Sequence, residues 1–201
     1  MLWSRPLEGL LRSGQPSEVK SEAPADNDSL PALVLCGCCM RAAVLTISDK
    51  GSIGLRQDTS GPAVAEVLKT IGAVVEKYEI VPDEVDVIAG RLSEYADILG
   101  LDLVITTGGT GVAPRDLTPE ATSRVIDREV PGMAEAMRME SFKKTPHALI
   151  SRAIVGIRRQ TLIINLPGSP RGATENLQFI LKAIPHAVEK IKGDPSECAQ
   201  Q

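Results

Sequence analysis

From residue 41 onward, short apolar runs alternate with longer stretches in which apolar residues recur at helical spacing. The short runs are rich in Val, Ile and Leu and stop at Gly, Pro, Ser or Asp, which is typical of buried strands. Because such runs are apolar on both faces, we expect them to form a sheet covered by helices on both sides. The predicted strands are "RAAVLTIS" (41–48), "VVEKYEIV" (74–81), "LDLVIT" (101–106) and "TLIINLP" (161–167).

The longer stretches have the periodicity of amphipathic helices. The first begins at the cap-type residues Thr59 and Ser60 and ends at Gly72. The second covers 82–100, where apolar residues recur at intervals of three and four. Further helices are predicted from Thr118, which we expect to cap its own helix, near 133–141, and across 171–193.

Strands separated by helical segments of this length favour right-handed crossovers and a mostly parallel sheet. Apolar residues make up 43% of the chain and aromatic residues only 2%, so aliphatic side chains must build the core. The predicted fold is therefore α/β, with three layers, α/β/α, around a mostly parallel sheet.

The two ends of the chain differ in composition from the middle. Residues 13–31, "SGQPSEVKSEAPADNDSLP", contain almost nothing to bury, which is typical of disorder. Met40 stands immediately before the first predicted strand. We therefore expect 1–39 to be disordered or a non-native N-terminal extension, 40–193 to be the α/β domain, and 194–201 to be a flexible tail. Mass spectrometry of protein made from the native gene tests whether the extension is expressed.

Charge and cysteine usage exclude several classes of function. The formal net charge is −4, and no block of Lys and Arg alternates with aromatic residues, so we expect no nucleic-acid partner. No apolar run approaches the roughly 20 residues that cross a bilayer, so we expect no membrane partner. Cys36, Cys38 and Cys39 have no paired CxxC spacing and no nearby histidine, which favours reduced thiols over a metal site. The expected location is the cytoplasm.

The candidate chemistry follows the predicted strands, because ligands of parallel sheets collect at the carboxyl ends of the strands. The third strand runs into "TTGGTG", where Gly108, Gly109 and Gly111 let backbone N–H groups approach an anion, and neighbouring threonines add donors. The loop is neither a Walker loop nor GxGxxG. His147 and His186 have no Ser or Cys partner at a recognisable spacing, so a hydrolase triad has no support.

Carboxylates and hydroxyls also follow the predicted strands. Asp116 either caps the next helix or binds magnesium or a phosphate; if Thr118 caps that helix, Asp116 is free for the second role. Asp83, in "PDE", is equally consistent with capping and with function. Ser48 and Asp49 are ordinary turn residues as well as site candidates, and "LPGSPRG" offers Gly168, Ser169 and Arg171 to a phosphate.

Several of these segments together resemble the molybdopterin-binding family of MogA and MoaB type. The segments cover about residues 41 to 192, in order and with short gaps. They are "LTISD", "DTSGP", "IVPDE", "TTGGTGVAPRDLTPEAT", "EVPGMAEAMR", "TPHALISRA" and "LIINLPGSPRGATENL".

The resemblance implies a molybdopterin adenylyltransferase that uses ATP and Mg²⁺ to make adenylylated molybdopterin and pyrophosphate. By position, the two acidic residues of the family, catalytic and metal-binding, fall on Asp83 and Asp116. The residues that would bind substrate are Ser48, Asp49, Thr107, Gly108, Gly109, Thr110, Gly111, Glu120, Pro167, Gly168 and Ser169.

The resemblance also implies a homo-oligomer, a trimer or hexamer, with the molybdenum-insertion enzyme of the pathway as a further candidate partner. The chain lacks the insertion that MogA proper carries after "LPG", which is similar to MoaB. Two alternatives therefore stay open. One is a non-catalytic molybdopterin-binding or scaffold protein, and the other is a nucleotide hydrolase related to competence-damage proteins, which "SDKGS" in place of Gly-Asp-Glu-Leu disfavours.

Overall fold

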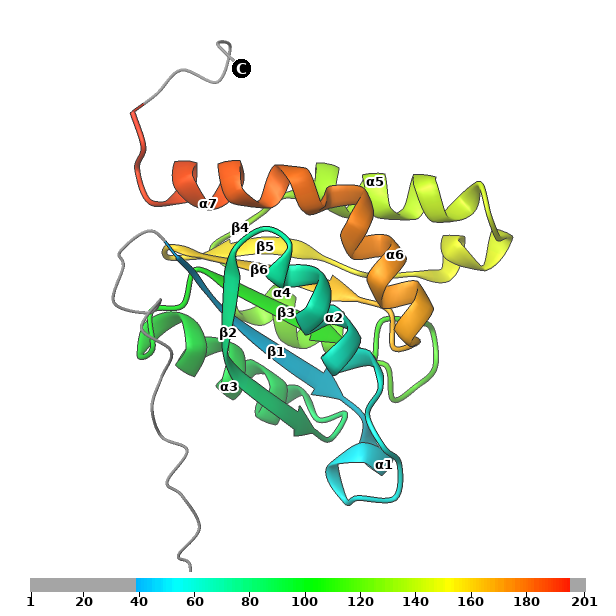
Figure 1. The fold of residues 1–201 in the computed structure, drawn as a ribbon. Helices are drawn as coiled ribbons and strands as arrows, with labels where there is room; N and C mark the ends of the chain where they lie inside the picture. Colours follow the sequence, from blue (N-terminus) through cyan, green and yellow to red (C-terminus); the bar gives the residue numbers. More distant parts are fainter. Residues whose placement is uncertain (1–38, 196–201) are drawn as a thin grey trace, which may run out of the picture. The chain divides into compact units, whose positions relative to one another are not determined.

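The computed structural model describes residues 39–195, which form a three-layer α/β/α domain (Figure 1). The sheet contains six strands in the order β2-β1-β3-β6-β5-β4. The first four in this order are parallel, and β5 and β4 are antiparallel to their neighbours. This confirms the predicted fold class. The strands are β1 Met40–Ile47, β2 Ala73–Val81, β3 Leu103–Thr107, β4 Arg128–Glu129, β5 Val155–Arg158 and β6 Thr161–Leu166.

Helices cover both faces of this sheet. On one face α2, α5, α6 and α7 share a core with the strands, and on the other face α3 and α4 pack against them. In Figure 1, α5, α6 and α7 lie above the sheet and α3 lies below it. The helices are α1 Asp49–Ser52, α2 Ser60–Lys69, α3 Val85–Asp97, α4 Thr118–Val125, α5 Pro131–Phe142, α6 Pro170–Ile180 and α7 Ile184–Ile191, with 3₁₀ turns η2 Pro146–Ile150 and η3 Leu181–Ala183.

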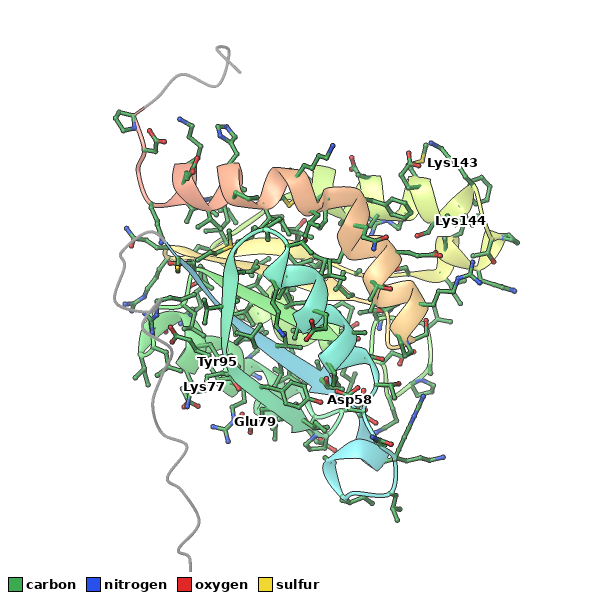
Figure 2. The ribbon with its side chains drawn as sticks, in the orientation of Figure 1. Asp58, Lys77, Glu79, Tyr95, Lys143 and Lys144 are labelled. Carbon is green, nitrogen blue, oxygen red and sulfur yellow. The ribbon has the colours of Figure 1, made fainter. Side chains whose placement is uncertain are left out.

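The central strands are as apolar in the structure as their sequences suggest. All five residues of β3 and all six of β6 are buried, which explains why no alternation marks either strand. One buried polar group is fully used: the Asn165 amide donates to the hydroxyls of Thr106 and Thr122, each at 2.9 Å. The hydroxyl of Tyr95, on α3, donates to the carboxylate of Glu79, on the edge strand β2, at 2.7 Å; Figure 2 labels both residues.

Three local expectations change. The sequence showed neither β4 nor β5, because two- and four-residue strands are too short for a periodic signal. Thr118 does not cap α4: the cap residue is Leu117, and the Thr118 hydroxyl donates to the carbonyl oxygen of Gly108 at 2.8 Å. Helix α2 is likewise not capped by the side chain of Thr59.

The predicted N-terminal extension up to residue 38, including Cys36 and Cys38, and the tail from 196 lie outside the described residues. Cys39 is described and is a free, partly buried thiol. Within residues 39–195, no helix is long and apolar enough to span a membrane.

Candidate functional site

The loops after β1, β2, β3 and β6 meet at one edge of the sheet and line a first cavity. The loops after β3 and β6, together with residues of α5, η2 and α6, line a second cavity that adjoins it. The first has a volume of about 410 Å³ and the second of about 460 Å³. Four residues line both: Gly109, Asp116, Gly168 and Ser169. This is the edge at which the sequence placed the chemistry. The first cavity also takes in Ser48, Asp83, Thr107 and Gly108, and the second takes in Thr110, Gly111 and Pro167.

The glycine loop after β3 tolerates no side chain at its centre. Gly108 has φ +107°, and a Cβ atom there would lie 2.2 Å from the carbonyl oxygen of Ile47. Gly109 has φ +61°, and a Cβ atom there would lie 2.5 Å from the hydroxyl of Thr118 and 2.9 Å from Oδ1 of Asp83. Positive φ and close approach are the conditions that require glycine. The loop therefore brings bare backbone to the wall shared by the cavities.

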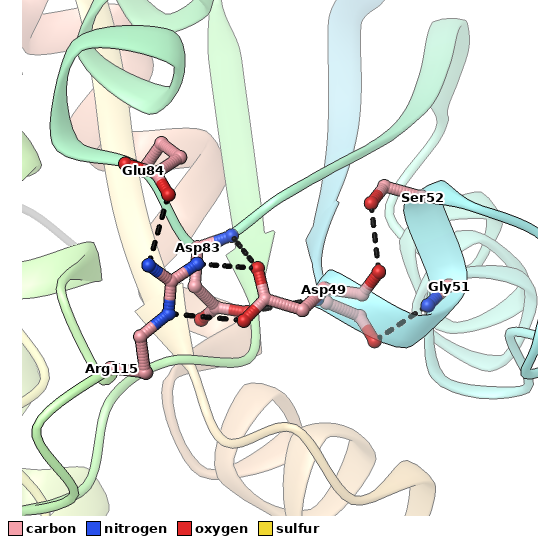
Figure 3. Close-up of polar contacts among 7 residues, drawn as sticks. Asp49, Gly51, Ser52, Asp83, Glu84 and Arg115 are labelled. Atoms are coloured by element: carbon pink, nitrogen blue, oxygen red, sulfur yellow. Dashed lines mark hydrogen bonds and ion pairs between the residues drawn. The ribbon is translucent and has the colours of Figure 1, made fainter.

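Asp83 is held at this loop by the turn after β1. Its N–H donates to Oδ1 of Asp49 at 3.0 Å, and the Asp49 N–H donates to Oδ2 of Asp83 at the same distance. Arg115 pairs with Asp49 at 2.7 Å and with Glu84 at 2.9 Å, and Figure 3 shows its guanidinium between the two. Arg115, in the loop after β3, thus connects the loops that follow β1 and β2.

The environment of Asp83 opposes its charge. Only 8% of the residue is exposed. Burial raises the pKa of Asp83; the N–H of Asp49 acts against this, while the nearby Asp49 and Asp116 carboxylates reinforce it. Conversely, the hydrogen bond from Arg115 lowers the pKa of Asp49. A positive ligand at the cavity would relieve the cost of charging Asp83, which is the behaviour of a site carboxylate.

Asp116 is less free than the sequence suggested. Its Oδ2 accepts the N–H of Ala113 at 2.8 Å, so the carboxylate closes the turn in which it stands. A Cβ atom at Gly111 would lie 2.7 Å from the same oxygen. The carboxylate nevertheless lines both cavities. Asp116 therefore has a structural role and also lines the site. The prediction that Thr118 caps α4 and so leaves Asp116 free was wrong.

Not every predicted residue lies in a cavity. Asp49 and Glu120 line neither one: Asp49 supports Asp83, and Glu120 pairs with Arg152. The Thr107 hydroxyl donates to the carbonyl of Pro167 at 2.7 Å and so joins two strand exits. Ser48 and Ser169 each accept a backbone N–H at 3.1 Å at the start of a helix. Their assignment to substrate stays a prediction.

Asp58 also lines the first cavity, although it was not among the predicted site residues. Its carboxylate accepts the hydroxyls of Thr46 at 2.5 Å and Tyr78 at 2.6 Å, and the N–H groups of Ser60 at 2.8 Å and Gly61 at 3.2 Å. Burial acts to raise the pKa of Asp58, but these hydrogen bonds outweigh it and lower the pKa. Figure 2 shows Asp58 beside the arrowhead of β1. Its position before "TSGP" was the available signal, since Asp accepts N–H groups at helix starts.

The residues fit a magnesium ion that is shared with a substrate. Asp83 and Asp116 both line the first cavity and both lie against the glycine loop. Among residues 39–195 no group of three or more His, Cys, Asp or Glu side chains forms a metal cage. Mg²⁺ at phosphate sites typically takes one or two carboxylates and completes its shell with phosphates and water. The donor set is consistent with that mode and not with a closed structural metal site.

Comparisons with known proteins find relatives that are named for molybdopterin chemistry. Molybdopterin adenylyltransferase of Helicobacter pylori (strain 26695) is 47% identical over 153 residues, covering 75% of this chain and 87% of that protein. The Escherichia coli K12 protein of the same name is 38% identical over 178 residues, covering 81% and 90%. The crystal structure of the molybdopterin biosynthesis enzyme MoaB from Thermus thermophilus matches with a TM-score of 0.74 and 52% identity, covering 79% of this chain and 99% of that one.

The family model described as a probable molybdopterin binding domain matches residues 43–186. This range contains every strand exit that lines the two cavities. The chain belongs to the molybdopterin-binding domain family.

Proposed function

We propose that the protein is a molybdopterin adenylyltransferase, which transfers AMP from ATP to the phosphate of molybdopterin and releases pyrophosphate. The observation that carries the proposal is the placement of two carboxylates against one glycine loop: Asp83 lines the first cavity, and Asp116 lines both. The names of the Helicobacter pylori and Escherichia coli relatives support it. Two cavities that share a wall suit a reaction that joins two substrates.

The reaction makes modest chemical demands on the protein. An oxygen of the molybdopterin phosphate attacks the α-phosphorus of ATP, a new P–O–P bond forms, and the bond from the α-phosphorus to the pyrophosphate oxygen breaks. The nucleophile is already an anion, so the chain needs to position two anions and offset their repulsion. The Gly108 N–H already donates to the carbonyl oxygen of Leu166 at 3.1 Å. The other N–H groups of the glycine loop, with Ser48 and Ser169 beside it, are the proposed donors to phosphate oxygens. Asp83 and Asp116 would hold Mg²⁺, which supplies charge neutralisation at the phosphates.

The direct test incubates the purified protein with molybdopterin, MgATP and inorganic pyrophosphatase, and assays adenylylated pterin. We expect product well above a no-enzyme control. Pterin that binds without forming product would favour the alternative, a non-catalytic molybdopterin-binding protein. The observation on the side of that alternative is the compact connection after β6, which ends at Leu166, to α6, which begins at Pro170, without an insertion after "LPG".

Asp116→Asn separates binding from turnover. The amide keeps an oxygen that accepts the Ala113 N–H, so the turn is retained, but the charge that holds Mg²⁺ is lost. We expect turnover to be abolished and pterin binding to stay near the wild-type value by equilibrium titration. Surviving turnover would show that this carboxylate is not the metal ligand.

The wider setting is part of the same proposal. We place the protein in the cytoplasm, as a homo-oligomer, a trimer or hexamer, that passes its product to the molybdenum-insertion enzyme. Sedimentation velocity of the purified protein checks the oligomer, and a single monomeric species at micromolar concentration would contradict it.

A further inference from the structure

Arg152 makes an unusual set of contacts for a residue that lines neither of the two site cavities. It lies between η2 and β5, in the segment "SRA". Its Nε donates to the carbonyl oxygen of Gly111 at 2.6 Å, and one Nη donates to the carbonyl oxygen of Asp116 at 2.5 Å. The other Nη pairs with the carboxylate of Glu120. Its backbone N–H donates to the carbonyl oxygen of Thr110 at 2.9 Å.

These contacts close the loop that carries Asp116. Gly111 and Asp116 stand at the two ends of the segment 111–116, and one guanidinium holds both carbonyl oxygens. Glu120 lies in the first turn of α4, so the same side chain ties the loop to the following helix. The planar fork of arginine presents N–H groups on three nitrogens in fixed directions, whereas lysine offers all its donors from a single nitrogen.

A movement of the loop 111–116 would displace the carboxylate of Asp116. Its Oδ2 would lie 2.7 Å from a Cβ atom at Gly111, and the same oxygen accepts the Ala113 N–H. If the carbonyl groups of Gly111 and Asp116 move apart, the carboxylate must move with them. Substrate positioning is sensitive to this, since a misplacement of about 1 Å can cost on the order of 100-fold in rate.

Arg124 shows what an ordinary surface arginine looks like in the same protein. It lies on α4 and makes one ion pair, with Asp86, in which the two side chains are 63% and 87% exposed. Exposed pairs of this kind contribute little to stability. Arg152 differs because two of its acceptors are backbone oxygens of the site loop. Arg152 thus contacts a loop of the site, whereas Arg124 makes only an exposed ion pair on the surface.

We propose that Arg152 is a positioning residue for the adenylyl-transfer site, which fixes the loop 111–116 and through it the carboxylate of Asp116. This inference rests on the proposed function. Arg152 touches no substrate in this role. Glu120 belongs to the same device, because its carboxylate orients the guanidinium from the α4 side.

The test uses the full chain and three variants: Arg152→Ala, Arg152→Lys and the control Arg124→Ala. Hydrogen exchange measures the order of the loop through the N–H groups of Ala113, Asp116 and Thr118, which are all hydrogen-bonded in the wild type. Steady-state kinetics of adenylylated-pterin formation measures kcat and KM for ATP. Thermal unfolding measures global stability.

We expect Arg152→Ala to speed exchange in 108–118 selectively and to lower kcat by about 10- to 100-fold, with a smaller change in KM. Arg152→Lys should fall between Arg152→Ala and wild type in both measurements, and it serves as the test if the alanine variant does not fold. Arg124→Ala should match wild type in both. A lowered melting temperature without selective loop exchange would identify a purely structural residue.

The proposal requires Arg152→Ala to change both loop exchange and kcat, so a change in only one of them overturns it. Faster exchange with unchanged kcat would show that the loop order does not matter to turnover, and reduced kcat with unchanged exchange would show that Arg152 acts in some other way. A wild-type protein that makes no product contradicts the proposed function instead. In that case exchange alone shows whether Arg152 orders the loop.

Discussion

Asp58 and Asp83 line the same cavity but meet opposite environments. Asp58 accepts two hydroxyls and two N–H groups, and its pKa is lowered. Asp83 accepts one N–H group, is 8% exposed, has two carboxylates nearby, and its pKa is raised. A carboxylate whose oxygens all accept hydrogen bonds stabilises the fold. A buried carboxylate with few donors is costly to ionise, and a cationic ligand can reduce that free-energy cost. From this comparison we propose a structural role for Asp58 and a role in the chemistry for Asp83.

Asp83→Asn is the strongest test of that assignment. The amide keeps an acceptor for the Asp49 N–H and removes the charge, so we expect turnover to fall on the order of 100- to 1000-fold. The melting temperature at neutral pH should rise, because a costly buried charge is gone. Asp86→Asn, on the exposed side of the same helix start, is the matched control and should change neither. A destabilised but active Asp83→Asn protein would reverse the assignment.

Asp58→Asn should have the opposite outcome. It removes charge-assisted hydrogen bonds, so we expect a loss of about 2 kcal/mol in the free energy of unfolding. In a domain of this size that corresponds to a drop of roughly 4 to 8 °C in the melting temperature. Turnover per folded molecule should change far less than in Asp83→Asn. Urea unfolding together with kinetics on the folded fraction measures both quantities.

The pH dependence of the two asparagine variants sharpens the same contrast. The lowered pKa of Asp58 gives stability that is present above its unfolded value of about 3.9 and is lost as pH falls through the folded value. The raised pKa of Asp83 gives stability that is present below its unfolded value and is lost as pH rises through the folded value. The deficit of Asp58→Asn should therefore shrink in acid, and the gain of Asp83→Asn should vanish there. Parallel curves for the two variants would refute the distinction.

Part of this contrast was visible in the sequence. The glycines after β3 and the strand exits were predictable, because buried strands are short apolar runs and ligands collect where parallel strands end. Only the contacts of Asp58 at the helix start were visible, because its other partners, Thr46 and Tyr78, come from strands 12 and 20 residues away in the chain. Glu120 was predicted to bind substrate from the family resemblance alone, and nothing local in the sequence reveals its pairing with Arg152, which is 32 residues away. Loops and helix caps can be predicted from neighbouring residues in the sequence. Which carboxylates already have hydrogen-bond or ion-pair partners depends on contacts between distant segments.

Gly111→Ala moves Asp116 without changing any charge. Gly111 does not have a positive φ, and the contacts of a Cβ atom there are with the Asp116 carboxylate alone, at 2.7 Å from Oδ2. We expect turnover to fall about 10-fold, because the carboxylate is displaced, with little change in the melting temperature. Gly90→Ala is the matched control: a Cβ atom there meets nothing within 4 Å, so a helical alanine should leave turnover unchanged. Equal turnover in Gly111→Ala and wild type would mean that the position of Asp116 is not critical.

Tyr78→Phe should give the smallest effect and tests whether Asp58 acts through its hydrogen bonds. The phenol donates to Asp58 at 2.6 Å, and burial together with this bond raises the pKa of Tyr78 to about 12. The residue is 46% exposed, so we expect a loss of about 1 kcal/mol in the free energy of unfolding and no change in kcat. The double variant with Asp58→Asn should cost less than the sum of the two single variants, because both remove the same bond. Strict additivity in urea unfolding would show that Tyr78 and Asp58 stabilise the protein independently, and the structural role of Asp58 would then depend on Thr46 and the backbone N–H groups of α2.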